Sequence, residues 1–169
     1  MTLPTAYHQL GKFTVDFQHI ETAVNDLLCL LTEPSDSEAV SILINELEYS
    51  QRLKTVDVLF ARFIDLRREP DLTDKPEFHK LIVELVKLGE RRNDLVHSKY
   101  FHWINFEGKT GLIRENSKLR GSKGMREQQE EELLPEAFNA DLKALSSASQ
   151  NLEKFRLKVI DYLYPDISD

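Results

Sequence analysis

The spacing of apolar residues along the chain is the feature that most constrains its fold. Between Pro4 and Pro34 they recur every three or four positions, at Leu10, Phe13, Phe17, Ile20, Val24, Leu27, Leu28 and Leu31. This spacing places them on one side of an α-helix. With only 6 Gly and 6 Pro in 169 residues, the composition is that of a helix-rich globular protein. We expect a single domain over residues 1–169, long enough to bury a core.

Three further helices are predicted. Ser35-Asp-Ser-Glu38 has the form of a capping box and starts a second helical region, with a change of phase near residues 47–50 that predicts a break and makes Ser50 a candidate cap. Asp74, with Pro76 in the first turn, starts a third helix that ends near His97. The last helix carries Leu134, Phe138, Leu142, Leu145, Leu152, Phe155 and Val159, and Pro165 ends it.

The period changes to two after the third helix. Residues 100–106 and 110–114, separated by Glu107-Gly-Lys, predict a β-hairpin. Residues 115–133 are polar and poorly periodic, and we interpret them as a long loop. The predicted fold class is therefore all-α: an antiparallel bundle of four to five helices with a small β-hairpin inserted before the last helix.

Composition excludes several functions. A net charge of −7 argues against indiscriminate binding to nucleic acid, which needs clustered Lys and Arg. No apolar stretch reaches the roughly 20 residues of a membrane span, so we expect a cytoplasmic protein without membrane contact. Cys29 lies in an apolar run and is expected in the core. Phosphate-loop, dinucleotide and paired-cysteine motifs are missing from the sequence, and no cofactor is predicted.

An arginine occupies a predicted core position near the end of the third helix. On a helical wheel, Arg92 lies within about 20° of the axis of the apolar stripe, and Asn93 and His97 flank it. That stripe consists of Phe78, Leu81, Ile82, Leu85, Leu88 and Val96. A buried unpaired charge costs several kcal/mol. Arg92 therefore either forms an ion pair with Glu21, which lies near the apolar stripe of the first helix, or contacts an anion at a cleft or subunit interface.

His97 also has two interpretations. Near a helix C-terminus, a histidine can stabilise the dipole or cap carbonyl groups. An imidazole with an ordinary pKa near 6.5 also suits general acid or base chemistry, and a neighbouring guanidinium suits a phosphate. Two Asp-x-x-His pairs, Asp16 with His19 and Asp94 with His97, could suggest a metal centre. Because these side chains do not converge on the helical wheel, no metal site is predicted.

Residues Arg92-Asn93-Asp94-Leu95-Val96-His97 resemble the motif of the HEPN (higher-eukaryote and prokaryote nucleotide-binding) superfamily. That motif is an Arg, a polar residue that is often Asn, Asp or His, three further residues and a His. Its place at the end of a long bundle helix, before a short extended segment and a final helix, is also similar. Ser98 stands where relatives often have glycine.

The resemblance implies metal-independent cleavage of RNA at a composite site formed by two protomers. His97 would deprotonate the ribose 2′-hydroxyl or protonate the leaving 5′-oxygen, Arg92 would hold the scissile phosphate, and Asn93 would orient them. Many members pair with an antitoxin, and others are inactive partners, nucleotide-binding modules or scaffolds. We therefore expect an endoribonuclease acting as a toxin or defence component, with a non-catalytic nucleotide- or RNA-binding or scaffold module as the alternative.

Helix geometry predicts a homodimer. Arg92 and His97 are five residues apart and project about 140° from one another on a straight helix, so a single protomer is poorly arranged to direct both at one phosphate. A twofold interface would bring Arg92 of one chain toward His97 of the other. We expect contact through the C-terminal half of the third helix, where Gly89 would permit close approach, with help from the first helix.

A basic stretch follows the motif. Its residues are Lys109, Arg114, Lys118, Arg120, Lys123 and Arg126. These side chains are candidates for binding RNA phosphates. In the alternative interpretation, the stretch is a solvated loop whose charges offset the acidic run at residues 127–132. Tyr100, Phe101 and Trp103 could stack on bases or pack the hairpin onto the bundle.

Overall fold

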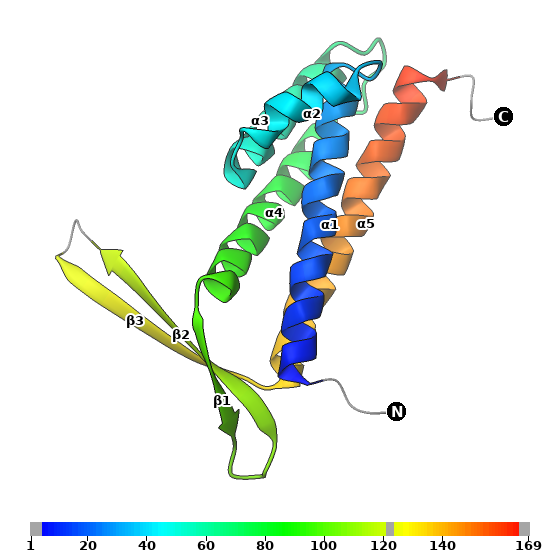
Figure 1. Cartoon of the computed structure of the whole chain (residues 1–169). Coiled ribbons are helices and arrows are strands. Elements are labelled where there is room, and N and C mark those ends of the chain that lie inside the picture. Colours follow the sequence, from blue (N-terminus) through cyan, green and yellow to red (C-terminus); the bar gives the residue numbers. More distant parts are fainter. Residues whose placement is uncertain (1–4, 121–123, 166–169) are drawn as a thin grey trace. The chain divides into compact units, whose positions relative to one another are not determined.

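A computed structural model describes residues 5–120 and 124–165. This part of the chain is mostly helical, with five α-helices and a small three-stranded antiparallel sheet (Figure 1). The elements are α1 (Ala6–Thr32), α2 (Ser37–Asn45), α3 (Tyr49–Asp65), α4 (Asp74–Val96), β1 (Lys99–Ile104), β2 (Thr110–Arg120), β3 (Met125–Leu133), the 3₁₀ turn η2 (Pro135–Phe138) and α5 (Asn139–Leu163). No described helix is both long enough and apolar enough to span a bilayer.

Contacts divide the chain into two compact units. The first unit contains the described residues of Met1–Phe17 and Glu90–Leu145, and the second contains those of Gln18–Gly89 and Ser146–Asp169. The motif at residues 92–97 and all three strands belong to the first unit.

The predicted helix boundaries agree with the structure to within a few residues. The expected break is confirmed, because α2 ends at Asn45 and α3 begins at Tyr49. Its cap is Glu48 rather than Ser50: the extended backbone of Glu48 precedes the helix, and its N–H donates to Oε1 of Gln51 at 3.0 Å. A side chain at N3 thus satisfies one backbone donor at the helix start.

Aromatic packing forms the core of the second unit. Phe60 of α3, Phe78 of α4 and Phe155 of α5 are buried, with ring centroids 4.1 to 5.3 Å apart. The α4 positions predicted for the core in this unit are confirmed as buried, and so is Cys29. Burying such large apolar side chains supplies about 1.5–3 kcal/mol each.

Gly89 is used within the chain. A Cβ at this position would lie 2.7 Å from Cε1 of Tyr49, so glycine lets the Tyr49 ring rest against α4. The Tyr49 hydroxyl donates to the Leu85 carbonyl at 3.3 Å. Burial, with a smaller contribution from the charge of Glu21, raises the pKa of Tyr49 and keeps this donor protonated. The space beside Gly89, where we expected a second copy to approach, is thus filled by Tyr49 of the chain's own α3.

The sheet begins with the predicted hairpin. β1 and β2 pair antiparallel from Lys99 with Glu115 to Ile104 with Thr110. The connecting turn needs Gly108, whose φ is +78°, and the Asn105 side chain accepts hydrogen bonds from the N–H groups of Glu107 and Lys109.

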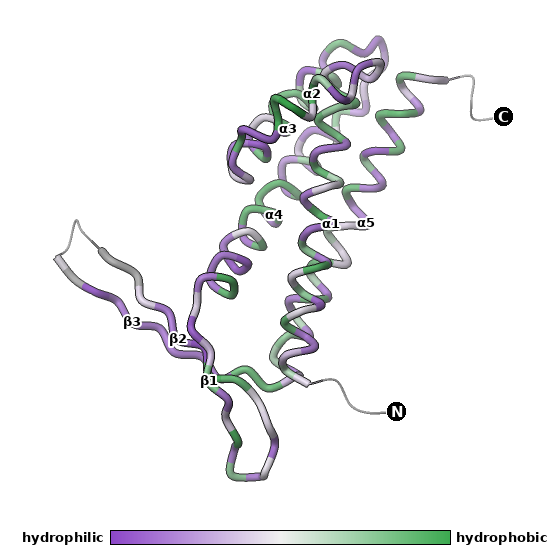
Figure 2. Tube along the Cα trace, in the orientation of Figure 1, coloured by the Kyte–Doolittle hydropathy of each residue, from purple (hydrophilic) through white to green (hydrophobic). Residues whose placement is uncertain are grey.

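The prediction of a long loop over residues 115–133 was wrong. β2 continues to Arg120, and β3 pairs with it from Leu112 opposite Leu133 to Arg120 opposite Met125. Figure 2 shows that β3 is largely hydrophilic, so it lacks the alternating apolar pattern that marks a half-buried strand. Its pairing relies on backbone hydrogen bonds and on the fully buried pair Leu112 and Leu133.

Candidate functional site

The motif residues lie at the C-terminal end of α4. The helix ends at Val96, and the N–H of His97 still donates to the Asn93 carbonyl at 3.1 Å. Asn93 and His97 are exposed, while Arg92 is half-buried. The core position predicted for Val96 was wrong, because Val96 is 43% exposed and its neighbour Leu95 is 1% exposed. The buried face at this end of α4 therefore passes through Leu95.

Arg92 contacts neutral groups within the first unit. Its Nη1 donates to Oδ1 of Asn93 at 3.1 Å, and its guanidinium carbon lies 6.0 Å from the centroid of the Phe17 ring. Contact with an aromatic face stabilises a cation without neutralising it. Glu21 belongs to the second unit, and its ion pair with Arg92 stays a prediction.

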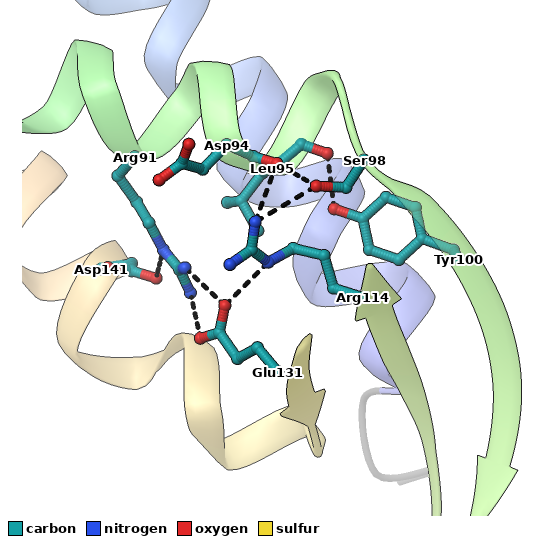
Figure 3. A network of polar contacts seen from close by, with 8 residues as sticks. All are labelled: Arg91, Asp94, Leu95, Ser98, Tyr100, Arg114, Glu131 and Asp141. Atoms are coloured by element: carbon teal, nitrogen blue, oxygen red, sulfur yellow. Dashed lines mark hydrogen bonds and ion pairs between the residues drawn. The ribbon is translucent and has the colours of Figure 1, made fainter. Parts of the chain in front are cut away.

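Arg91, which the sequence interpretation passed over, forms the main ion-pair network at this end of the helix (Figure 3). Two of its nitrogens donate to the two carboxylate oxygens of Glu131 at 2.8 and 2.9 Å, and Nε donates to Asp141 at 2.9 Å. Burial lowers the pKa of Arg91, but the hydrogen bonds to Glu131 and Asp141 outweigh it, and the net shift is upward. A bidentate pair of this kind fixes geometry as well as charge.

Arg114 joins the same network from β2. It is 5% exposed, and its Nε donates to Glu131 at 2.8 Å. Its Nη1 donates to the Asp94 carbonyl and to the Ser98 hydroxyl, both at 3.2 Å. The sequence had made Arg114 a candidate for RNA phosphates, but its guanidinium is directed at the end of α4 (Figure 3). We assign it the structural task of satisfying carbonyl groups that the helix leaves unpaired.

Two hydroxyl groups complete the cap. Ser98 donates to the Asp94 carbonyl, and the Tyr100 hydroxyl of β1 donates to the Leu95 carbonyl at 2.5 Å. Burial raises the pKa of Tyr100, so this donor stays protonated near neutral pH. The carbonyl groups of Asp94 and Leu95, shortly before His97, are thus held by Ser98, Tyr100 of β1 and Arg114 of β2.

A pocket of about 470 Å³ opens beside His97. Its walls include Lys99 of β1 and facing stretches of β2 and β3, with Glu115 and Glu130 among the charged residues. All of its lining side chains are polar or charged. Its residues offer both hydrogen-bond donors and acceptors.

The predicted basic residues are dispersed. Lys109 lies 3.5 Å from Glu107 and lines a different pocket, of about 430 Å³, near Gln9 and Glu136. Lys118 and Arg120 belong to β2, but their side chains, like the whole of Lys123, lie outside the described residues.

The acidic run lies on β3, directly across the ladder from part of the basic stretch. The register places Lys118 opposite Glu127 and Arg114 opposite Glu131. Opposite charges at facing positions stabilise a strand pair. Among the described side chains, Glu131 of the acidic run offsets Arg114 in an ion pair of 2.8 Å, within a β-ribbon rather than a loop.

Comparisons of the chain with family models, with curated proteins and with solved structures found no match. The resemblance of residues 92–97 to the HEPN motif stays a prediction.

Proposed function

We propose that this protein is a HEPN-like, metal-independent endoribonuclease whose active site is composed at a homodimer interface. The observation that carries the proposal is the exposed His97 imidazole on the wall of a polar pocket. Arg92 precedes it by five residues, and the partners of its guanidinium within the first unit are neutral, so they leave its positive charge for a phosphate. These are the acid–base and phosphate-binding groups that cleavage of RNA without metal requires.

In the proposed reaction, His97 accepts the proton of a ribose 2′-hydroxyl. The 2′-oxygen attacks the adjacent phosphorus, the bond to the 5′-oxygen breaks, and the products are a 2′,3′-cyclic phosphate and a free 5′-hydroxyl. The protonated His97 then gives this proton to the leaving 5′-oxygen. Arg92 stabilises the charge that develops on the phosphoryl oxygens, and Asn93 orients the Arg92 guanidinium through their hydrogen bond.

The dimer is part of the proposal because one helix does not direct Arg92 and His97 to a common point. Val96, an exposed apolar residue between Asn93 and His97, supplies contact surface at this end of α4. The proposal includes an antiparallel helical bundle as the fold, and a cytoplasmic toxin or defence role with an antitoxin partner. A non-catalytic RNA-binding or scaffold module is the alternative that the assay below distinguishes.

The direct test is cleavage of structured and single-stranded RNA in the presence of a chelator. We expect wild type to cleave and His97→Ala to lose at least about a hundredfold in rate, as expected for removal of a general acid–base group. His102→Ala is the matched control, because His102 is an exposed histidine on β1. Equal rates for wild type and His97→Ala, or no cleavage by either, would leave the non-catalytic module as the better description.

Mixing two inactive variants tests the composite site. Arg92→Ala and His97→Ala chains that exchange subunits form heterodimers in which one Arg92 still faces one His97. Random pairing makes half of the dimers heterodimeric, each with one of two sites intact, so about a quarter of the wild-type rate should return. If the rate does not rise on mixing although subunits exchange, both residues act within one chain.

A further inference from the structure

The pocket beside His97 contains two carboxylates at one level of the sheet. Glu115 of β2 and Glu130 of β3 are direct cross-strand partners, so their side chains emerge on the same face of the ribbon. Directly opposed residues have Cβ atoms about 5 Å apart, and like charges at such positions are destabilising. A ligand that donates hydrogen bonds to both carboxylates would relieve this repulsion.

The same pocket carries hydrogen-bond donors on that face, four residues from Glu130 along β3 and beside Glu115 on β1. Arg126 of β3 donates through Nε to the Ser117 hydroxyl at 2.7 Å, a contact that uses one of the five N–H donors of its guanidinium. Lys99, the β1 partner of Glu115, adds an ammonium group on the opposite side. The pocket therefore offers acceptors in its middle and cationic donors around them.

Among the RNA bases, guanine matches this arrangement most closely. Its N1–H and N2–H groups are adjacent donors that a carboxylate can accept together, while O6 and N7 are acceptors that Arg or Lys contacts. Adenine and cytosine each have one exocyclic amino donor, and uracil has one ring N–H. These bases therefore form fewer hydrogen bonds with the carboxylates of the pocket. A guanidinium plane can also stack on a base, which suits a pocket lined by polar side chains.

We infer that the pocket binds a guanine base of the RNA next to the scissile phosphate, with Glu115 and Glu130 as the residues that determine specificity. This inference rests on the proposed ribonuclease function, because it places the base beside His97. It adds a sequence preference that the motif itself does not contain.

The test measures binding apart from cleavage. Guanosine 3′-monophosphate is titrated into the full-length protein by NMR, alongside the adenosine, cytidine, uridine and inosine 3′-monophosphates. We expect the guanosine nucleotide to bind about tenfold or more tightly than the adenosine nucleotide, a ratio consistent with charge-assisted hydrogen bonds. Inosine, which lacks the 2-amino group, should bind between them.

Glu115→Gln and Glu130→Gln should each remove most of this preference. Both substitutions relieve repulsion between facing carboxylates, so the ribbon is expected to stay folded. Glu132→Gln is the matched control, because Glu132 is an exposed glutamate of β3 outside the pocket lining, and it should keep the wild-type preference.

Equal affinities for the five nucleotides, or a guanine preference that survives both substitutions, would overturn the inference. Cleavage of RNA without preference for guanine would also overturn the inference, but it would support the proposed ribonuclease function. A guanine preference that depends on Glu115 and Glu130, without any cleavage of RNA, would support guanine binding in the pocket and contradict the proposed ribonuclease activity.

Discussion

At the scale of single residues, Glu131 has the most demanding position, because it accepts hydrogen bonds from Arg91 of α4 and Arg114 of β2. Burial raises the pKa of Glu131, but the hydrogen bonds and charges of the two arginines outweigh this effect, and the pKa lies below its ordinary value of 4.5. Ionised Glu131 therefore stabilises the folded chain above about pH 4.5, and this stabilisation is lost as the pH falls through the lowered pKa.

We predict that Glu131→Gln lowers the free energy of unfolding at pH 7 by about 2 kcal/mol, because Arg114, which is 5% exposed, loses its ion pair and Arg91 loses one of its two carboxylate partners. The difference from wild type should shrink as the pH falls below about 4.5, because the unfolded wild-type chain binds a proton at Glu131 before the folded chain does. Urea denaturation at pH 7 and pH 3.5 measures both effects. Glu132→Gln, an exposed neighbour, should change stability by less than about 0.5 kcal/mol. A loss that is equal at the two pH values would show that the Glu131 charge is not its cause.

At the scale of elements, the junction between β2 and β3 depends on Gly111. A Cβ there would lie 2.8 Å from the Leu133 carbonyl oxygen and 3.1 Å from the Leu134 side chain. Because the nearest atom belongs to the backbone of β3, the two strands would have to move apart. The absence of a side chain at Gly111 thus allows β3 to reach the buried position of Leu133.

We predict that Gly111→Ala destabilises the protein by about 1–3 kcal/mol, the usual cost of overpacking. Gly11→Ala is the control, because a Cβ on that exposed position of α1 meets nothing within 4 Å. Alanine is the better helix former, so the control should stabilise by about 0.5–1 kcal/mol. Urea denaturation of both variants gives the comparison, and a stabilised Gly111→Ala would contradict the observed approach of β3.

At the scale of the whole molecule, the proposed chemistry requires a dimer in which Val96 is covered. We predict a dimer at micromolar concentration by light scattering, and we expect Val96→Asp to yield monomers and to lose RNA cleavage, because the substitution places a charge in an apolar contact. The helical circular dichroism should be unchanged, since Val96 is 43% exposed in the single chain.

Val58→Asp is the matched control for the dimer experiment. Val58 of α3 is 68% exposed, so the substitution adds the same charge elsewhere on the surface and should leave the dimer intact. A wild-type monomer that still cleaves RNA would contradict the proposal that the active site is formed by two chains. If Val96→Asp remained dimeric with undiminished activity, the dimer interface would have to lie elsewhere than at this end of α4.

The sequence by itself determined the helices, because each rests on local features: apolar residues three or four positions apart, capping residues and prolines. It also determined the β1–β2 hairpin, whose strands are close neighbours in the chain. Only the tertiary structure decided that β3 is a strand, because its partners on β2 supply the pairing that its own polar pattern does not indicate. The same holds for Arg91 and Arg114: their partners lie 40, 50 and 17 residues away, and contacts at such separation leave no periodic signal in the sequence.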